Sequence, residues 1–362
     1  MLSYKPNAAS VMERLRALYA RQASDRIFAT TAIPSPTLAA FAAAHAAGYC
    51  DCPDPAERAA FWDALLRESA LLDDDSIPSA YLSEMDQGIY GAVLGARIQF
   101  MVDPATGWIS SMVPPLLDDW SGFERLRFDP AHPWFARYRR QMEVFLQRAS
   151  GKFAVSHFIL IDSLNFAFEL VGATKTYLAL DEHPDVLRRV IDFAFDLNVA
   201  IQQAFFDTVP LLGGGTASNM VQWMPGRIVS ESVDPFHMTS VRHFEQWGRE
   251  PIQRMFARFD GGVAHIHGNG RHLIEAVSTL RGLKAVFLGD DKGFPLAFDV
   301  LPTIRARAGD LPLVVSCPYQ SFCDRLKHRQ LPGGVLYRVQ DVPDAASANR
   351  LMDLVRAYRT DA

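Results

Sequence analysis

The chain has 362 residues, of which 49% are hydrophobic and 21% charged, with a formal net charge of −5 at pH 7. This composition is that of an ordinary globular protein with enough apolar residues for a sizeable core. No block of lysines and arginines forms the basic surface that a nucleic-acid-binding protein needs, so nucleic acid is not an expected partner.

The N-terminus carries charged residues at helical spacing and lacks the apolar core of a signal peptide. No apolar run reaches the length of about 18 residues that spans a membrane. We therefore expect a cytoplasmic protein with no membrane partner. Four cysteines in a chain of this length do not predict a disulfide framework.

Residues 1–75 show helical periodicity and predict a helical N-terminal extension, which the acidic turn 73–76 and Pro78 bring to an end. In residues 76–362, short apolar runs alternate with longer amphipathic stretches. The predicted strands are 80–82, 97–102, 153–161, 210–213, 262–267, 283–288, 313–316 and 335–339. The predicted helices include 184–206, 240–259, 272–280, 298–308 and 345–358.

This alternation of strands and helices predicts an α/β fold, specifically a closed (β/α)8 TIM barrel that forms the catalytic domain over residues 76–362. No Gly-x-Gly-x-x-Gly turn follows the first strand, which disfavours a dinucleotide-binding fold. Reactive groups of such barrels sit at the carboxyl ends of the strands. The functional site is therefore expected among polar residues that end the predicted strands.

Two histidines two residues apart are the strongest candidates. His265 and His267 share one face of the predicted strand 262–267, about 7 Å apart along it, and can bind one metal ion or one acidic substrate group. Gly268 and Gly270 leave room for something to approach the backbone. Other polar residues at predicted strand ends are Asp162, Asn165, Glu231, Asp234, Asp290, Asp291, Cys317, Gln340 and Asp341.

Several segments resemble the uroporphyrinogen decarboxylase superfamily in their order and spacing. Residues 162–172, DSLNFAFELVG, resemble a conserved segment of that superfamily, and residues 222–227, QWMPGR, resemble the start of another. His265-Ile266-His267-Gly268 stands in the place of its His-x-Cys-Gly or His-x-Asp-Gly, and residues 343–349 resemble its closing helix start. The resemblance covers roughly residues 76 to 360.

The resemblance implies a (β/α)8 barrel and one of two activities. These are decarboxylation of a tetrapyrrole without a cofactor, and zinc-dependent methyl transfer between a corrinoid and a thiol such as coenzyme M. The chain departs from the superfamily at residues 338–341, where neither the last catalytic histidine nor the metal-binding cysteine occurs. The arginine-containing opening motif is echoed at residues 21–26, but its tyrosine is missing and we attribute the echo to chance.

A catalytic zinc ion needs three protein ligands and an open position. His265 and His267 supply two, and Asp290 or Asp291 at the end of the next strand can supply the third, in the way that related thiol-methylating zinc enzymes use an acidic residue after their histidine motif; we assign Asp290. Cys317 at the next strand end is a further candidate ligand. The bound zinc would activate a thiol or water.

A metal-free alternative remains open, in which His267 is a general acid or base tuned by Asp234 or Asp290. Glu231 is a further catalytic candidate together with Asp234, although such acidic residues often cap the next helix instead. The pair of histidines can also be a purely structural feature that hydrogen-bonds neighbouring carboxylates.

Four residues are candidates for contact with the substrate. Asp162 and Asn165 either bind substrate or cap a helix that begins near residue 164. Phe168 and Trp223 either line a pocket or belong to the core, where aromatic side chains are common.

The sequence thus predicts a zinc-dependent methyltransferase that moves a methyl group between a small donor and a corrinoid or thiol. Cobalamin or another corrinoid is the expected co-substrate, a small molecule the other, and a corrinoid protein a candidate partner. One alternative is a cofactor-free decarboxylase or lyase of a carboxylated aromatic or tetrapyrrole, with His267 and Asp234 in proton transfer. Another is a barrel that binds a ligand without catalysis.

Overall fold

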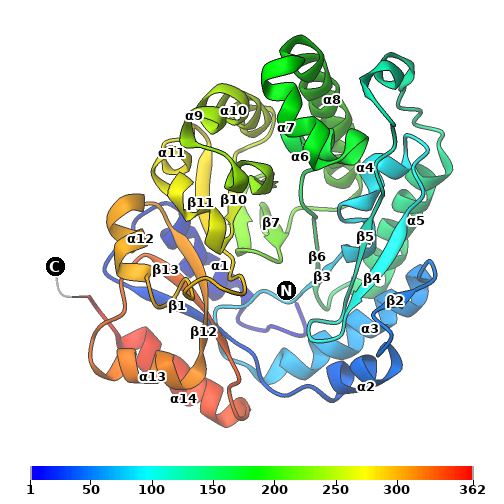
Figure 1. The fold of residues 1–362 in the computed structure, drawn as a ribbon. Helices are drawn as coiled ribbons and strands as arrows, with labels where there is room; N and C mark the ends of the chain where they lie inside the picture. The colour runs from blue at the N-terminus through cyan, green and yellow to red at the C-terminus, as the bar shows by residue number, and fades with distance from the viewer. Residues whose placement is uncertain (1, 361–362) are drawn as a thin grey trace.

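The computed structural model describes residues 2–360 as a mixed α/β fold around a six-stranded parallel sheet (Figure 1). The strand order is β1-β13-β12-β11-β10-β9, and every neighbouring pair is parallel. The bounds are β1 (Ile27–Thr31), β9 (Val229–Ser232), β10 (Gly262–Ile266), β11 (Leu283–Leu288), β12 (Leu313–Pro318) and β13 (Val335–Gln340). Nearly all of their residues are buried, as expected of a parallel sheet covered on both faces.

Two more parallel strands continue this order beyond β9. Strand β3 (Ser79–Tyr81) pairs with β6 (Ala154–Ser156), and Ile159, three residues past β6, forms a parallel bridge with Ser230 of β9. Parallel neighbours therefore follow chain order from β3 through β6 and β9 to β13, and β1 follows β13.

Two buried carboxylates accept hydrogen bonds from backbone N–H groups along the free edge of β1. Asp74 accepts a hydrogen bond from the backbone N–H of Thr31 at 2.7 Å, and Asp75 accepts one from Ala29 at 3.0 Å. Asp75 also forms an ion pair with Arg14. The acidic turn at residues 73–76 thus covers backbone donors that would otherwise be left unpaired at the edge.

Strand β1 is where the structure differs from the expected helical extension over residues 1–75. Helices α1 (Ala8–Tyr19), α2 (Pro36–Ala44) and α3 (Pro55–Glu68) are present, but β1 lies between α1 and α2 and pairs with β13. All five β1 residues are buried, so the sequence shows no alternation that would mark a strand. The segment therefore contributes to the central sheet.

Two predicted strands also differ from those observed. The 97–102 strand is β4 (Gln99–Asp103), which lies outside the central sheet between β2 (Tyr49–Cys50) and β5 (Trp108–Met112) in antiparallel pairing. Residues 210–213 form a loop, and β7 (Gly215–Ser218) follows, paired with β8 (Gln222–Pro225).

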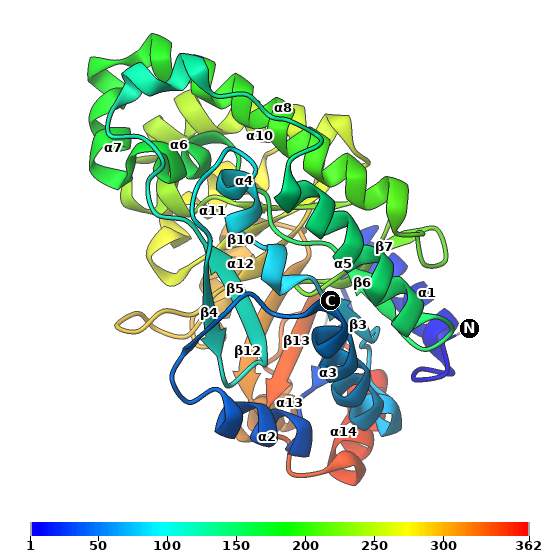
Figure 2. The ribbon, with the colours of Figure 1, turned by 90° about the vertical axis from the view of Figure 1, so that its right-hand side faces the viewer.

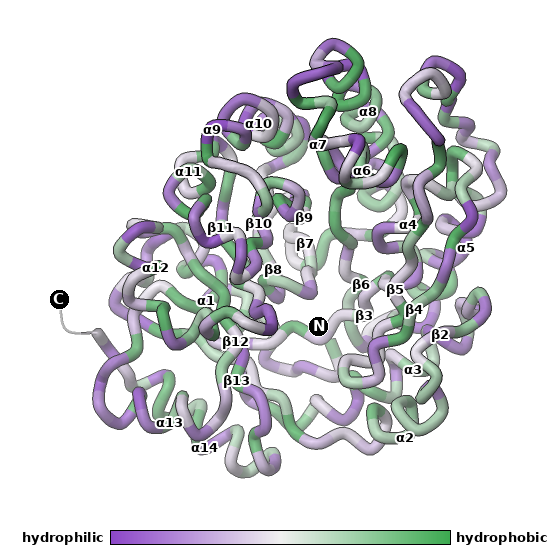
Figure 3. Tube along the Cα trace, in the orientation of Figure 1, coloured by the Kyte–Doolittle hydropathy of each residue, from purple (hydrophilic) through white to green (hydrophobic). Residues whose placement is uncertain are grey.

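The helices lie around the strands, with hydrophilic residues concentrated on the outer helices and loops (Figures 1 and 3). Helix α8 packs against both α5 and α10 (Figure 2). No helix within residues 2–360 is long and apolar enough to cross a membrane. The remaining helices are α4 (Gly88–Ala92), α5 (Pro133–Ala149), α6 (Ser163–Val171), α7 (Ala173–Glu182), α8 (Pro184–Thr208), α9 (Val241–His243), α10 (Arg249–Arg258), α11 (Ile274–Ser278), α12 (Leu301–Ala308), α13 (Tyr319–Lys327) and α14 (Ala345–Ala357).

Candidate metal centre

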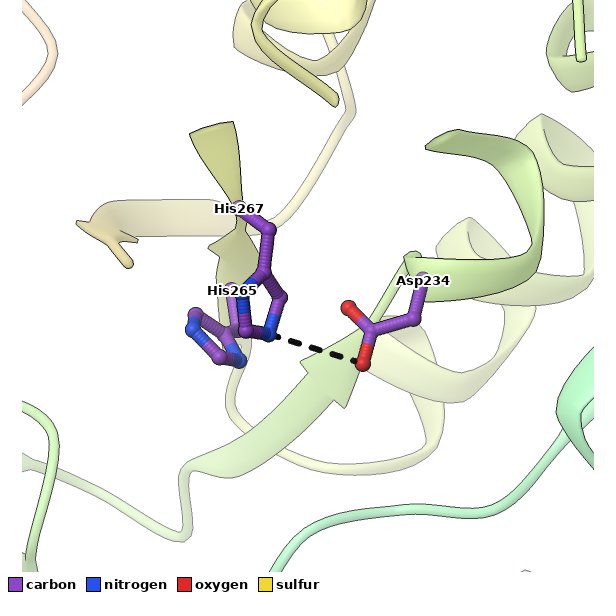
Figure 4. Close-up of side chains that lie close together, drawn as sticks. All are labelled: Asp234, His265 and His267. Carbon is purple, nitrogen blue, oxygen red and sulfur yellow. Dashed lines mark ion pairs between the residues drawn. The ribbon is translucent and has the colours of Figure 1, made fainter. Parts of the chain in front are cut away.

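Strand β10 positions both histidines of the predicted pair. His265 lies on the strand between Ser232 of β9 and Phe287 of β11, and His267 follows at the carboxyl end of the strand. Because they are two residues apart, their side chains share one side, and the ring centroids are 4.3 Å apart. In Figure 4 the ring of His267 points toward the turn that follows β9, and the ring of His265 lies beside it.

That turn supplies the third member of the group. Asp234 begins the 3-10 turn Asp234–Met238, and its Oδ2 lies 3.8 Å from Nε2 of His267. One potential ligand atom from each of Asp234, His265 and His267 lies within 4.8 Å of the other two. Figure 4 shows these three side chains facing one another. Within residues 2–360, these three residues form the one group of histidines, cysteines and carboxylates whose potential ligand atoms lie close enough together to hold a metal ion.

A second carboxylate orients His267 from its other side. Nδ1 of His267 lies 2.7 Å from Oδ1 of Asp291, which leaves Nε2 directed toward Asp234. Although partial burial acts in the opposite direction, the hydrogen bond and charge of His267 hold the pKa of Asp291 below its usual value. The backbone N–H of Asn269 also donates to Asp291. A histidine ligand held in this way by a carboxylate is typical of protein zinc sites.

A third imidazole, His237, lies beside both Asp234 and His267, with its ring centroid 5.8 Å from that of His267. Its Nδ1 is 3.6 Å from Oδ1 of Asp234, and its Nε2 is buried without a hydrogen-bond partner. Burial, reinforced by the charge of His267, lowers the pKa of His237 and of His265 to about 3 each. Both rings are therefore neutral at pH 7, the form in which imidazole binds a metal.

Glycines make room for these rings. A Cβ atom on Gly289, just after β11, would lie 2.7 Å from Nε2 of His265 and 3.2 Å from Nδ1 of His267. A Cβ atom on Gly270 would overlap the ring of His237. Of the two glycines after His267 at which the sequence predicted a close approach, Gly270 is approached by the ring of His237 and Gly268 by Phe294.

The chemistry of the group fits a divalent transition metal. Two imidazoles and one carboxylate form a donor set used by catalytic zinc, with a position left for water or substrate. Oδ1 of Asp234 is buried and has no hydrogen-bond partner, so the carboxylate retains unused acceptor capacity. Burial raises the pKa of Asp234 even though His267 counteracts the shift, and a bound cation would remove that cost.

Two of the predicted zinc ligands lie apart from this group. Asp290 forms an ion pair with Arg271 at 3.2 Å and accepts a hydrogen bond from the backbone N–H of Ala297 at 2.6 Å. Cys317 is buried against the backbone of β13, and burial raises the pKa of its thiol. Asp234 takes the position that the sequence analysis gave to Asp290. The neighbouring Asp291 faces His267 because successive residues point in different directions after β11.

Asp162 and Glu231 form a buried carboxyl pair behind Asp234. Each side chain is hydrogen-bonded to the other, and both are at most 1% exposed. Burial raises the pKa of Asp162 to about 6, and burial together with the charge of Asp162 raises that of Glu231 well above its usual value. The shared hydrogen bond lowers the pKa of Asp162 and raises that of Glu231, so Glu231 is the donor in it.

The other predicted substrate contacts have structural partners. Nδ2 of Asn165 donates to the backbone carbonyl of Ser232 at 2.6 Å, which ties α6 to the end of β9. Phe168 is partly buried and meets Tyr177 edge-on. Trp223 is fully buried and donates from Nε1 to a backbone carbonyl, so it belongs to the core and does not line an open pocket.

Two residues near the site were not among the predicted ligands or catalytic groups. His237 follows Asp234 by three residues, a spacing that could have indicated a shared site. Arg338 stands in an apolar strand and lines a cavity of about 270 Å³. The sequence feature that could have identified Arg338 is its charge within an otherwise apolar strand.

The fold and site together define a mixed α/β protein with a candidate metal centre at the carboxyl edge of its parallel sheet. Among eleven matching chains of solved structures is a methyltransferase from Methanosarcina mazei, with a TM-score of 0.61. The match covers 96% of this chain and 98% of that chain at 12% sequence identity, and it shows that the fold is shared. No protein-family model and no curated protein matches the sequence.

Proposed function

We propose that this chain is a metal-dependent methyltransferase of the uroporphyrinogen decarboxylase superfamily, which moves a methyl group between a small donor and a corrinoid or thiol. The proposal rests on the convergence of Asp234, His265 and His267 at one edge of the sheet, with His267 oriented by Asp291. The fold shared with a methyltransferase supports this reading.

The proposed scaffold is a closed (β/α)8 barrel. Parallel neighbours run in chain order through β3, β6 and β9 to β13, and β1 follows as the eighth strand. Between β1 and β3, the carboxylates of Asp74 and Asp75 occupy the backbone donors of β1. In a barrel of this kind the carboxyl ends of the strands form the active face, which is where Asp234 and His267 lie.

Asp234, His265 and His267 would hold the ion, which we propose is zinc. Bound there, zinc would lower the pKa of a substrate thiol, so that the thiolate is available at neutral pH. The low pKa values of His265 and His237 keep these rings neutral, and Asp291 keeps Nε2 of His267 directed at the site. In the transfer, a bond forms between the thiolate sulfur and the methyl carbon, while the bond from that carbon to the donor breaks and leaves its electron pair on the donor.

Metal analysis tests the site. Protein purified without a polyhistidine tag and supplied with zinc should contain close to one equivalent, and His265→Ala and Asp234→Ala should each contain far less. Asp290→Asn is the matched control and should retain the metal, because Asp290 lies outside the group. Less than a tenth of an equivalent in the unmodified chain would contradict the proposal. Stoichiometric iron, which the same donor set also suits, would contradict zinc.

Absorbance spectroscopy tests the reaction. Methylcobalamin mixed with the zinc-loaded protein and a small thiol should lose its spectrum as the methyl group passes to sulfur, and His265→Ala should abolish the change. An unchanged spectrum with a range of thiols, at full zinc occupancy, would count against a corrinoid donor.

One observation favours a metal-free decarboxylase as the second candidate. His267 lies between two carboxylates, 2.7 Å from Asp291 and 3.8 Å from Asp234, which is an arrangement suited to proton transfer. Release of carbon dioxide from a carboxylated substrate by metal-free protein would support this function in place of methyl transfer.

A further inference from the structure

Arg338 is a charged residue in an otherwise apolar strand. On β13, Val335, Leu336, Tyr337 and Val339 are completely buried. The side chain of Arg338 is enclosed by the protein but keeps accessible area toward the cavity of about 270 Å³. Gln340, two residues further on the same face, lines the same cavity.

The protein supplies no counter-ion for this guanidinium. Across residues 2–360, the side chain of Arg338 has no ion pair and no hydrogen-bond acceptor, and no aspartate or glutamate lines the cavity. Burial lowers the pKa of Arg338, with no acidic neighbour acting against the shift. The polar residues that line the cavity are otherwise neutral, among them Thr31, Asn219 and Gln222.

A desolvated cation without a partner is energetically unfavourable. The cost of keeping Arg338 here is offset when an anion enters the cavity, and a guanidinium fork matches a planar carboxylate through two parallel hydrogen bonds. Arg338 makes a cation–π contact with Phe287, with its Cζ 5.2 Å from the ring centroid. This contact does not use the N–H donors of the guanidinium, which remain free.

Phe287 also connects Arg338 to the candidate metal centre. Its ring lies 5.1 Å from that of His265, so one aromatic side chain contacts both the guanidinium and a proposed metal ligand. The ring of Phe287 thus lies between the guanidinium and His265, and a small molecule bound to Arg338 would reach the metal centre by extending past this ring, because no residue of the centre lines the cavity. Tyr81 and Trp108, whose rings are 4.9 Å apart, line the same cavity and offer an apolar surface to the carbon skeleton.

We propose that Arg338 binds a carboxylate of the small substrate and so determines substrate specificity, with the reactive atom directed toward the group formed by Asp234, His265 and His267. The inference rests on the proposed function for the identity of the reactive end, which is a thiol. The recognition of the carboxylate by Arg338 rests on the cavity alone.

Matched pairs of probes test the two parts separately. On zinc-loaded protein, calorimetry would compare 3-mercaptopropionate with 3-mercapto-1-propanol, which differ in the carboxylate. On metal-free protein, butyrate would be compared with 1-butanol, a measurement that needs neither zinc nor turnover. The variants are Arg338→Met, Arg338→Lys and the control Arg325→Met, whose arginine contacts Phe298 and Asp299 away from the cavity.

In the unmodified protein, each carboxylate should bind at least tenfold more tightly than its neutral partner. Arg338→Met should remove this preference while leaving affinity for the neutral probe unchanged, Arg338→Lys should restore part of it, and Arg325→Met should preserve it. The melting temperature of ligand-free Arg338→Met should be equal or higher, since the variant removes an unpaired buried charge.

Equal binding of the two metal-free probes, or a preference that survives in Arg338→Met, would overturn the inference. A lower melting temperature of Arg338→Met with unchanged carboxylate preference would assign Arg338 a structural role in its place. Butyrate binding that depends on Arg338 in a protein that neither binds zinc nor transfers methyl groups would support this inference and reject the proposed function.

Discussion

At the scale of single residues, the candidate centre depends on the direction in which one imidazole presents its nitrogen atoms. His267 has Asp291 at 2.7 Å from Nδ1 and Asp234 at 3.8 Å from Nε2, so the two carboxylates act on different nitrogens. The shorter contact fixes the ring, and the longer one leaves space for an ion between the ring and Asp234. Asp291 therefore orients the ring of His267, while Asp234 would bind the ion.

Replacement of Asp291 tests this division. Asp291→Asn keeps the shape of the side chain but weakens its hydrogen bond to His267, so zinc affinity should fall by about 10- to 100-fold while the protein remains folded. Competition with a chelator of known affinity gives the measurement. Asp290→Asn, one residue away and outside the group, is the control; equal losses in the two variants would show that the effect is not specific to His267.

Gly289 sets how closely β11 approaches the imidazoles. In Gly289→Ala, the added Cβ would push on both rings, because it would lie 2.7 Å from His265 and 3.2 Å from His267. We expect zinc affinity to fall at least tenfold and the free energy of unfolding to fall by about 1–3 kcal/mol, the usual cost of overpacking. Titration with zinc and urea unfolding provide the two values.

Gly268→Ala is the comparison for that variant. Its added Cβ would lie 2.9 Å from Cβ of the 46% exposed Phe294 and 3.3 Å from Oδ2 of Asp291, and neither imidazole is among these contacts, so the loss of zinc affinity should be smaller. If Gly268→Ala lowered zinc affinity more than Gly289→Ala, packing against the rings would not be the cause.

At the scale of elements, β1 depends on the acidic turn that covers its edge. Asp75 is completely buried, accepts a hydrogen bond from Ala29 and forms two hydrogen bonds with Arg14. The carboxylate thus joins α1 and β1, so a chain segment before the first strand contributes to closing the sheet edge.

Asp75→Asn should destabilise the protein substantially. The substitution removes the negative charge of the buried Asp75 and leaves Arg14, whose side chain is 25% exposed, without its partner, so the cost should be about 1–3 kcal/mol, below that of breaking a fully buried ion pair. Urea unfolding would measure the loss. Asp25→Asn changes an exposed aspartate near Arg26 and Arg359 and should shift the free energy of unfolding by less than about 1 kcal/mol. A small effect of Asp75→Asn would mean that β1 does not need this cover.

At the scale of the whole molecule, the sequence predicted the strands that are continuous apolar runs. Strand β11 has the predicted bounds Leu283–Leu288, because its sequence LKAVFL is apolar except for Lys284, as is typical of a strand buried on both faces. Strands β1 and β9 were missed. The first is a short run between helices, and the second, Val229–Ser232, buries two serines and Glu231, so that its burial has no counterpart in hydrophobicity.

The part of the site that lies on a single strand could be predicted from the sequence. The part that depends on how several strands and turns are placed could not. The spacing of His265 and His267 places them on one side of any strand. Which carboxylate meets them depends on the turn after β9 and on the register after β11, and these positions bring Asp234 and Asp291 together with the histidines and leave Asp290 outside. Local periodicity contains no information on either position.

Two of the buried groups that contribute to the pH dependence of stability, Asp162 and His157, have effects of opposite sign. Burial raises the pKa of Asp162 to about 6, so the stability it contributes is fully present below about pH 3.8 and is lost as the pH rises through 6. Burial lowers the pKa of His157 to about 4, so its contribution is present above about pH 6.5 and is lost as the pH falls through 4. Between pH 6.5 and 4.5 the two effects largely cancel in the unmodified chain.

Single substitutions should separate them. On acidification from pH 6.5 to 4.5, metal-free Asp162→Asn should lose about 2 kcal/mol more stability than the unmodified chain, because the gain from protonating Asp162 is gone. His157→Gln should lose about 2 kcal/mol less over the same range, because the buried ring no longer resists a proton that the unfolded chain accepts. Urea unfolding at both pH values measures this, with the exposed Asp185→Asn as a control that should follow the unmodified chain. Shifts of the same sign in the two variants would contradict the assignment, since opposite signs follow directly from an acid buried with its proton and a base buried without one.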